Sequence, residues 1–257
     1  MNSERNSKAL RETKSTLVGY LLLGYPEKNA FLELVKRCDE SALDIFEIGV
    51  PSNSPYADGE VIRKAHQTVD SGLAEDIAYF QAVRNLTTKP IWLMAYYDEF
   101  IKSKSYLAFA KNAIVDAFVI PDMTFEQRCL LRDEMEPYHI DVLGFSNPEM
   151  TDEELHSYFE NFPIVYEQLY IGRTGKQGSS EEYMHMLEVS KQYPNLARFA
   201  GFGISSKDKS KKLLQEGFDG VIIGTELVNR LNKSMEHMVQ FINEVGDEIK
   251  ADERANL

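Results

Sequence analysis

Residues 43–59 read LDIFEIGVPSNSPYADG, and this stretch combines an apolar run, a turn and two acidic side chains. Its first part is rich in β-forming residues, which predicts a strand buried in the protein core. Glu47 lies within that strand, and Asp58 lies in the loop that follows it, just before Gly59. A carboxylate in a buried strand is strongly destabilising unless it is paired or protonated. Glu47 is therefore either a general acid–base group or a structural residue paired with an Arg or Lys elsewhere in the chain.

The alternation of apolar run and helical segment extends in both directions from this stretch. Seven further runs predict strands, at residues 17–23, 90–96, 116–120, 140–144, 164–171, 197–199 and 219–223. Helical spacing of apolar residues predicts helices between them, and a polar helix is expected over residues 3–13. Eight strand-then-helix units predict an α/β fold, a (β/α)8 TIM barrel with an extra N-terminal helix. A doubly wound sheet is the alternative. No linker interrupts residues 1–257, so we expect a single barrel domain.

The composition argues against several classes of function. The 257 residues are 43% hydrophobic and 27% charged, which is typical of a folded protein with a sizeable core. The formal net charge of −13 repels phosphate backbones and anionic lipid, so we expect neither a nucleic-acid partner nor a membrane partner. A small phosphorylated ligand is still compatible with this charge, because backbone amides at helix N-termini can hold a phosphate.

The cysteines and the N-terminal residues favour a cytoplasmic protein. Cys38 and Cys129 lie far apart in helical patterns, outside any C-x-x-C motif, so we expect buried free thiols in a reducing compartment. The first residues, MNSERNSKALRETK, lack the apolar core of a signal peptide. The longest apolar stretch, residues 17–23, is too short to span a bilayer.

Glycines follow the last three predicted strands. Gly175 and Gly178 lie in the loop after the sixth strand, Gly203 follows the seventh, and Gly224 with Thr225 follows the eighth. In such a barrel the functional groups gather at the carboxyl ends of the strands, and phosphate sites commonly follow strands seven and eight. Glycines also occur in ordinary turns, so each one alone is weak support. Together they predict a phosphate site, with a helix that begins near Thr225 pointing its positive end at the ligand.

Other chemistries have little support in the sequence. The five histidines are His66, His139, His156, His185 and His237. They lack the spacing of metal ligands, and we interpret them as surface or interface residues. Lys89 precedes a strand and Lys176 lies in a loop, so neither suits a Schiff-base aldolase. We expect no metal and no cofactor, and predict an acid–base pair facing a phosphate site with Tyr96 and Phe202 as aromatic walls.

Residues 47–51 (EIGVP) and 54–59 (SPYADG) resemble the signature of the tryptophan synthase α subunit family, E-[LI]-G-x-P-[FY]-S-D-P-x-A-D-G-P. The similarity covers nearly the whole chain. Its further motifs are residues 23–26 (LGYP), 93–97 (LMAYY), 121–122 (PD), 173–175 (RTG) with Gly178, 201–205 (GFGIS) and 219–225 (DGVIIGT). The spacing of the first two segments and the order of the others make the resemblance specific.

The resemblance implies a carbon–carbon lyase of tryptophan biosynthesis that cleaves indole-3-glycerol phosphate, by a retro-aldol reaction, to indole and glyceraldehyde 3-phosphate. Glu47 would shuttle protons between the glycerol hydroxyl and indole C3. Asp58 would hold the indole N–H and stabilise the positive charge that develops there. The resemblance assigns phosphate binding to Gly178, Gly203, Gly224 and Thr225, and the walls of the indole pocket to Tyr96 and Phe202.

Several positions depart from the family pattern. Residues 51–55 read PSNSP where the family has P-F-S-D-P, and residues 98–99 read DE where it has Asn-Pro. Gln177 stands where the family has a threonine that helps align the second carboxylate, and Thr124 replaces a proline.

The first of these departures concerns the partner. The resemblance implies a tryptophan synthase β subunit in an α2β2 complex, but Ser52, Asn53 and Ser54 differ where the family faces that subunit. Two alternatives therefore stay open beside the lyase. One is a divergent α-like protein that binds a phosphorylated ligand or a β-type subunit without efficient turnover. The other is a lyase for a different phosphorylated substrate.

Overall fold

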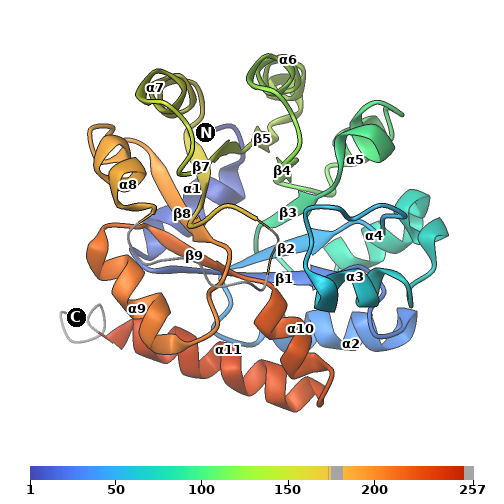
Figure 1. Ribbon diagram of the computed structural model, residues 1–257. Coiled ribbons are helices and arrows are strands. Elements are labelled where there is room, and N and C mark those ends of the chain that lie inside the picture. Colours follow the sequence, from blue (N-terminus) through green and yellow to red (C-terminus); the bar gives the residue numbers. More distant parts are fainter. Residues whose placement is uncertain (173, 175–181, 252–257) are drawn as a thin grey trace.

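The structure, a computed structural model, describes residues 1–172, 174 and 182–251 (Figure 1). Within these ranges its centre is a sheet of nine parallel strands in the order β5-β4-β3-β2-β1-β9-β8-β7-β6. The strands are β1 (Thr16–Leu22), β2 (Ile45–Gly49), β3 (Ile91–Met94), β4 (Ala117–Val119), β5 (Asp141–Val142), β6 (Gly144–Ser146), β7 (Ile164–Gln168), β8 (Ala197–Gly201) and β9 (Gly220–Ile223).

The sheet closes through its fifth position. Only Leu143 separates β5 from β6, and β5 pairs with β4 while β6 pairs with β7. The two are therefore halves of one strand that joins both edges of the sheet. The predicted α/β fold, a (β/α)8 barrel, is confirmed.

Helices surround the barrel (Figure 1). They are α1 (Glu4–Glu12), α2 (Lys28–Asp39), α3 (Glu60–His66), α4 (Ile77–Arg84), α5 (Tyr106–Lys111), α6 (Phe125–Met135), α7 (Asp152–Asn161), α8 (Met184–Ser190), α9 (Lys207–Glu216), α10 (Thr225–Leu231) and α11 (Met235–Ile249). Short helical turns η1 (Ser71–Glu75), η2 (Tyr97–Ile101) and η3 (Glu136–Tyr138) lie in the loops. Among the described residues, none of these helices combines the length and the apolar character that crossing a bilayer requires.

Two expectations differ from the structure in detail. The strand predicted to reach residue 171 ends at Gln168, whose side-chain amide donates to the Gly172 carbonyl at 3.2 Å and so closes a bend. Cys38 is buried as expected, but Cys129 is half-buried. The buried face of α6 is formed by Arg128, Leu131 and Met135. Successive helix residues are rotated by about 100°, so Cys129 lies beside this face and not on it.

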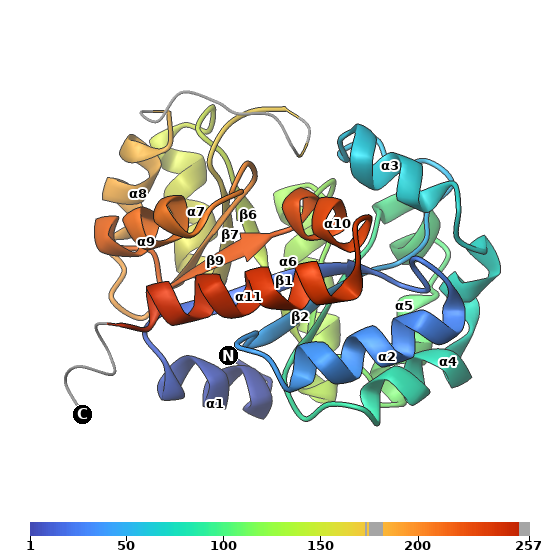
Figure 2. The same ribbon diagram turned by 90° about the horizontal axis from the view of Figure 1, so that it is seen from below.

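The interior of the barrel is filled at the amino ends of the strands. The rings of Trp92 and Phe199 meet edge-on inside the barrel, with centroids 4.9 Å apart. The indole N–H of Trp92 donates to the side chain of Asn6 at 2.9 Å. Asn6 belongs to α1, which lies across this end of the barrel (Figure 2). A cavity can therefore open at the other end, where the strands point.

Candidate active site

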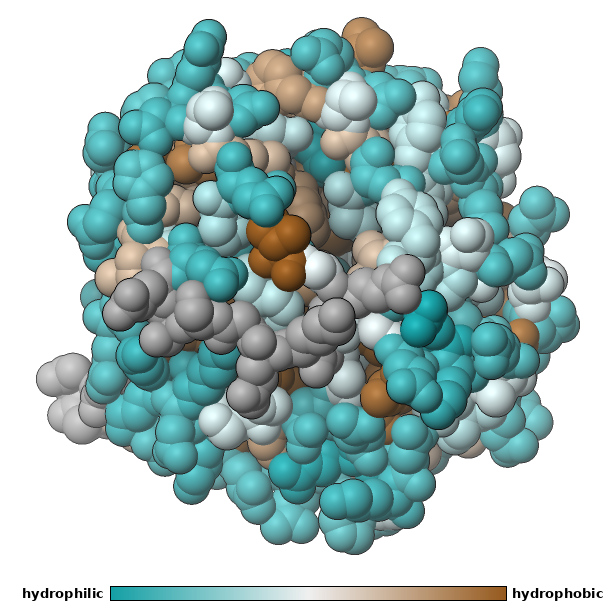
Figure 3. All heavy atoms as spheres, in the orientation of Figure 1, coloured by the Kyte–Doolittle hydropathy of each residue, from teal (hydrophilic) through white to brown (hydrophobic). Residues whose placement is uncertain are grey.

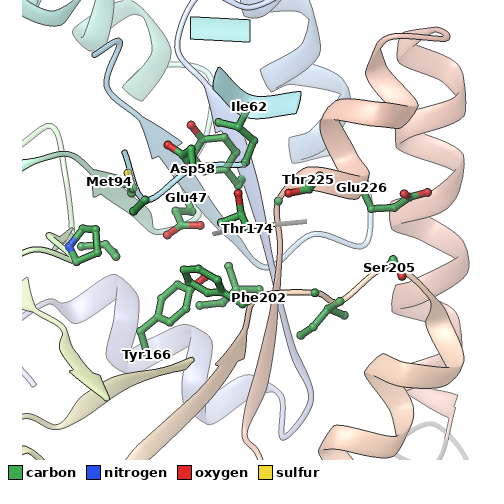
Figure 4. Close-up of a pocket in the computed structure, with 18 of the residues that line it drawn as sticks. Glu47, Asp58, Ile62, Met94, Tyr166, Thr174, Phe202, Ser205, Thr225 and Glu226 are labelled. Carbon is green, nitrogen blue, oxygen red and sulfur yellow. The ribbon is translucent and has the colours of Figure 1, made fainter. Parts of the chain in front are cut away.

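A cavity lies at the carboxyl ends of the strands and encloses about 920 Å³ including its open mouth. Figure 3 shows one face of the molecule as mostly hydrophilic, with a hollow near its centre. In the close-up, Glu47 and Asp58 lie on one side of the cavity, and the rings of Tyr166 and Phe202 lie opposite them (Figure 4).

Glu47 projects from β2 into this cavity and is 4% exposed. Gly49 lies two residues further on, so it faces the same way. A Cβ at Gly49 would collide with the hydroxyl of Tyr20, which is the β1 residue in register with Glu47. Burial, and then the negative charge of Asp58, raise the pKa of Glu47 to about 8. The Glu47 carboxyl is therefore mostly protonated at neutral pH, as a general acid has to be.

Asp58 is held in the loop that joins β2 to α3 and is 2% exposed. Its Oδ2 atom accepts a hydrogen bond from the Tyr96 hydroxyl at 2.7 Å. Burial and the neighbouring Asp58 raise the pKa of Tyr96, so the phenol keeps its proton and stays a donor. Tyr96 was predicted as a wall of the pocket. The structure places it beside Asp58, with its ring on Tyr56, and the cavity lining in the described part of the chain does not include it.

His66 corrects the prediction that the histidines lie at the surface. It is 6% exposed, and its Nδ1 atom accepts from the Ser52 backbone N–H at 3.1 Å. Its Nε2 atom lies 3.7 Å from Asp58 Oδ2. Sequence spacing could have indicated this approach, because His66 lies at the end of the short helix that begins two residues after Asp58.

The aromatic side of the cavity is built around Phe202. Phe202 adopts a left-handed backbone conformation with φ of 71°, which strains a residue with a side chain by about 1–3 kcal/mol. Its ring packs edge-on against Phe145, Tyr166 and Tyr170, with centroids 6.4, 5.9 and 6.2 Å away. Gly201 makes room for this packing, because a Cβ there would collide with the Tyr166 ring.

The sequence interpretation missed several lining residues. Tyr20, Met94, Phe145, Tyr166 and Ile222 all line the cavity from strands. Side chains alternate between the two faces of a strand, and Tyr20 is the β1 residue in register with Glu47, so the two side chains face the same way. The register itself had to come from the structure.

The far end of the cavity carries the residues predicted for phosphate. Gly203, Gly224 and Thr225 all line it, and α10 begins at Thr225 as expected. The Thr225 hydroxyl is buried and has no hydrogen-bond partner within the described ranges. Gly178 lies outside the described residues, as do Gly175 and Gln177.

Charges near this end are arranged so that an anion is tolerated. Glu226 also lines the cavity, but its carboxylate is bonded to the Arg230 guanidinium at 2.6 Å. The Lys209 amine donates to the Gly203 carbonyl at 2.9 Å, which places a cation behind the loop that follows β8. Both contacts reduce the local negative charge of a strongly acidic protein.

Thr174 joins the loop after β7 to the loop that carries Asp58. Its Oγ1 atom accepts from the Gly59 N–H at 2.8 Å, and its own N–H donates to the Ala57 carbonyl at 3.4 Å. Thr174 also lines the cavity (Figure 4). The family resemblance places a threonine that helps align the second carboxylate at the position of Gln177, which lies outside the described residues. Thr174 instead bonds to the residues immediately before and after Asp58, Ala57 and Gly59.

The chain is similar over nearly its whole length to proteins of one family. The family model described as "Tryptophan synthase alpha chain" matches residues 7–255. The tryptophan synthase alpha chain of Arabidopsis thaliana is 28% identical over 239 residues, 90% of this chain and 87% of the relative. That of Methanosarcina acetivorans is 27% identical over 252 residues, 93% and 91% of the two chains.

Solved structures agree with these matches. A chain of Mycobacterium tuberculosis tryptophan synthase superposes with a TM-score of 0.84 at 22% identity, over 96% of this chain and 98% of that chain. A chain of the Pyrococcus furiosus structure described as a tryptophan synthase α2β2 complex gives a TM-score of 0.76 at 25% identity, over 92% and 98%.

Proposed function

The chain belongs to the tryptophan synthase alpha chain family, and from this premise we propose that it cleaves indole-3-glycerol phosphate to indole and glyceraldehyde 3-phosphate. Membership makes the chain a lyase of tryptophan biosynthesis. The observation that supports this reaction most directly is the pair of buried carboxylates in one cavity. Glu47 has a pKa raised to about 8, and Asp58 lies on the same side of the cavity.

In the proposed reaction Glu47 acts first as an acid and then as a base. Its carboxyl donates a proton to C3 of the indole ring, which places a positive charge on the ring nitrogen. The resulting carboxylate then takes the proton of the glycerol hydroxyl on the carbon next to the ring. As that proton leaves, the carbon becomes an aldehyde and the carbon–carbon bond breaks. The electrons of this bond restore the neutral indole, so the proton count is unchanged.

Asp58 stabilises the intermediate in this proposal. Its carboxylate accepts from the indole N–H and faces the positive charge that C3 protonation creates. The Tyr96 hydroxyl holds one oxygen of Asp58, and Thr174 fixes the backbone on both sides of it. A buried carboxylate held in this way needs little rearrangement when the charge appears, which is the usual source of electrostatic catalysis.

The remaining predicted residues bind the two ends of the substrate. Phe202 packs against the indole ring together with Tyr166, and Tyr96 acts from behind Asp58. The phosphate is bound at the far end of the cavity by Gly203, Gly224 and Thr225. The family resemblance adds Gly178, which lies outside the described residues. The unpartnered Thr225 hydroxyl and the neutralised Glu226 support this placement. Small residues there allow backbone N–H groups to approach an anion.

Family membership favours the lyase over the non-catalytic alternative considered from the sequence. Of the changes that suggested that alternative, those at described positions lie outside the cavity lining. Glu47, Asp58 and Thr174 are present and meet in the cavity. A different phosphorylated substrate would have to place a proton acceptor near Glu47 and a hydrogen-bond donor near Asp58, as indole-3-glycerol phosphate does.

We also propose that residues 1–257 work as a single domain in the cytoplasm, without a metal or cofactor. The reaction supports the last point, because proton transfer by carboxylates is sufficient for a retro-aldol cleavage. Cys38 and Cys129 are free thiols, which is compatible with a reducing compartment.

A β subunit is the proposed protein partner. The Pyrococcus furiosus relative is described as part of an α2β2 complex. In the present chain the candidate face is a groove that Ser52, Asn53, Glu75 and Glu99 border. Asn53 donates its backbone N–H to Glu99 at 3.2 Å, so the two segments that depart from the family pattern contact each other. This mutual contact supports a partner surface that changed as a unit.

Turnover is the direct test of the proposed function. Purified protein incubated with indole-3-glycerol phosphate, alone and with a tryptophan synthase β chain, is expected to release indole and glyceraldehyde 3-phosphate in equal amounts. Glu47→Gln keeps the shape of the side chain but removes its proton, so kcat is expected to fall by about 10²- to 10⁴-fold. Absence of indole in both mixtures, from folded wild-type protein, would contradict the proposal.

Glu167→Gln is the matched control for this experiment. Glu167 is a second fully buried glutamate, on β7, and its pKa is also raised to about 8 by burial. It does not line the cavity formed by the described residues. Glu167→Gln is expected to leave kcat within about twofold of wild type. Burial with a raised pKa does not by itself make a glutamate catalytic; the side chain must also face the substrate cavity, as Glu47 does.

A further inference from the structure

His66 is buried at the end of α3 in an orientation that is set by the backbone. Its side chain is 2% exposed, and its Nδ1 atom accepts from the Ser52 N–H at 3.1 Å. A ring nitrogen that accepts a hydrogen bond carries no proton. The imidazole is therefore neutral while this contact exists, and its single proton lies on Nε2.

The Nε2 atom faces the carboxylate assigned to the indole nitrogen. It lies 3.7 Å from Asp58 Oδ2, and it has no hydrogen-bond partner in the described part of the chain. This separation is longer than a hydrogen bond. Catalytic contacts are often long in an empty site and tighten when the substrate is bound. A buried N–H without another partner gains most from such tightening.

We propose that His66 is a positioning residue for Asp58, donating from Nε2 to the Oδ2 atom that Tyr96 also contacts. This inference rests on the proposed function, in which Asp58 stabilises positive charge on the indole ring. Two donors on one oxygen fix the plane of the carboxylate and leave Oδ1 to meet the substrate N–H. Because the Ser52 N–H keeps the ring neutral, His66 orients Asp58 without cancelling its negative charge.

Two substitutions separate the contacts of His66. In His66→Asn the shorter amide can still accept from the Ser52 N–H near the position of Nδ1 but cannot reach Asp58. In His66→Gln the amide nitrogen lies near the position of Nε2 and can donate to Asp58. We expect His66→Asn to lower kcat about tenfold or more with KM changed less than about threefold, because positioning Asp58 matters most in the transition state. We expect His66→Gln to recover kcat to within about threefold of wild type.

His185→Asn is the control for these variants. His185 also faces an aspartate, with Nε2 at 2.6 Å from Asp152, but both side chains are largely exposed. The kcat of the His185→Asn variant is expected to match that of wild type. Equal kcat for His66→Asn and wild type, or an equal loss in both His66 variants, overturns the positioning role.

A second measurement does not depend on turnover. Nitrogen-15 NMR of labelled histidine is expected to show His66, assigned by its loss in His66→Gln, as the neutral Nε2–H tautomer. Its Nε2 resonance should shift in Asp58→Asn and not in Asp152→Asn. A Nδ1–H tautomer, or no response to Asp58→Asn, overturns the inference. If wild-type protein releases no indole while these NMR results hold, the proposed function fails and the His66–Asp58 contact stands.

Discussion

Glu47 and Glu167 are two buried glutamates on strands of the same barrel, and their neighbours give them different uses. Glu47 points into the cavity and has Asp58 as its charged neighbour. Glu167 follows Tyr166, which faces the cavity, so the strand turns Glu167 outward. Its neighbours are the Ser190 hydroxyl and the Arg198 guanidinium, which oppose the rise in its pKa. Burial raises both pKa values to about 8. The two glutamates differ in that only Glu47 faces the cavity formed by the described residues and can reach a bound ligand.

Both glutamates are expected to make the stability of the protein depend on pH. A carboxyl with a raised pKa binds its proton more tightly in the folded state than in the unfolded state, where the model value is 4.5. Its contribution is therefore fully present below about pH 4.5 and is lost as pH rises toward 8. Glu47→Gln and Glu167→Gln remove this loss. Each variant is expected to exceed wild type in stability by about 1–3 kcal/mol at pH 8.5.

Thermal unfolding at a series of pH values measures this effect. The Tm of each variant minus that of wild type should widen from pH 5 to pH 8.5 and change little above pH 9. Glu47→Gln should therefore be more stable and inactive, and Glu167→Gln more stable and active. A difference in Tm that is the same at every pH would show that the buried carboxyls do not titrate in this range.

At the scale of elements, the contact between two loops decides where Asp58 lies. Thr174, in the loop after β7, bonds to Ala57 and Gly59, and its carbonyl lies against the α-carbon of Gly59. A side chain at position 59 would collide with that carbonyl. The backbone of Gly59 has φ of −75°, which any residue can adopt, so space and not conformation requires glycine here.

Gly59→Ala is expected to lower kcat/KM by about tenfold or more, because the added methyl group pushes Thr174 off the Asp58 loop. The Tm is expected to change by less than about 3 °C, since α3 still begins at the next residue. Steady-state kinetics and thermal unfolding of the same samples give both numbers.

Gly72→Ala is the matched control for the loop contact. A Cβ at Gly72 would meet the flexible Asp70 side chain at 3.2 Å, away from the cavity. Its kcat/KM is expected to equal that of wild type. Unchanged kinetics in Gly59→Ala would argue that the Thr174 contact is not needed for turnover.

At the scale of the whole molecule, the two ends of the barrel have separate tasks. The amino end is closed by α1, where the fully buried Asn6 bonds to Trp92, to Asp141 Oδ2 at 2.8 Å and to the Asp116 carbonyl at 3.2 Å. The cavity lies at the carboxyl end. This division is general for such barrels, since the loops after the strands can vary while the packed amino end maintains the fold.

Asn6→Ala is expected to destabilise the protein without changing catalysis. The substitution leaves the Trp92 N–H and the Asp141 carboxylate short of a partner in a buried place, a loss of about 2–4 kcal/mol. The Tm is expected to fall by about 5–10 °C, with kcat at 25 °C within about twofold of wild type. Lys8→Ala on the same helix, where the side chain is 68% exposed, should change neither. A fall in kcat in folded Asn6→Ala protein would mean that the two ends are coupled.

The sequence alone was sufficient for the order of strands and helices. Strands buried on both faces read as continuous apolar runs, and β1 is buried at all seven positions. Helices read as a 3.6-residue period. Both patterns are local, so the order of elements followed from them, and eight strand-then-helix units favoured a barrel over a doubly wound sheet. Glu47 was noticeable for the same reason, because a charge is conspicuous inside an apolar run.

The contacts around the site depended on the tertiary structure. The position of Tyr96 beside Asp58 and the place of Thr174 between Ala57 and Gly59 join segments whose relative positions no local pattern specifies. Spacing along the chain places His66 near Asp58, but only the rotation of α3 decides that the Nε2 atom faces the carboxylate. These contacts depend on strand register, on the closure of the sheet through β5 and β6, and on the rotation of α3. Each of those is set by packing over the whole barrel. Composition and periodicity therefore determined which residues could carry the chemistry, and packing decided which of them meet.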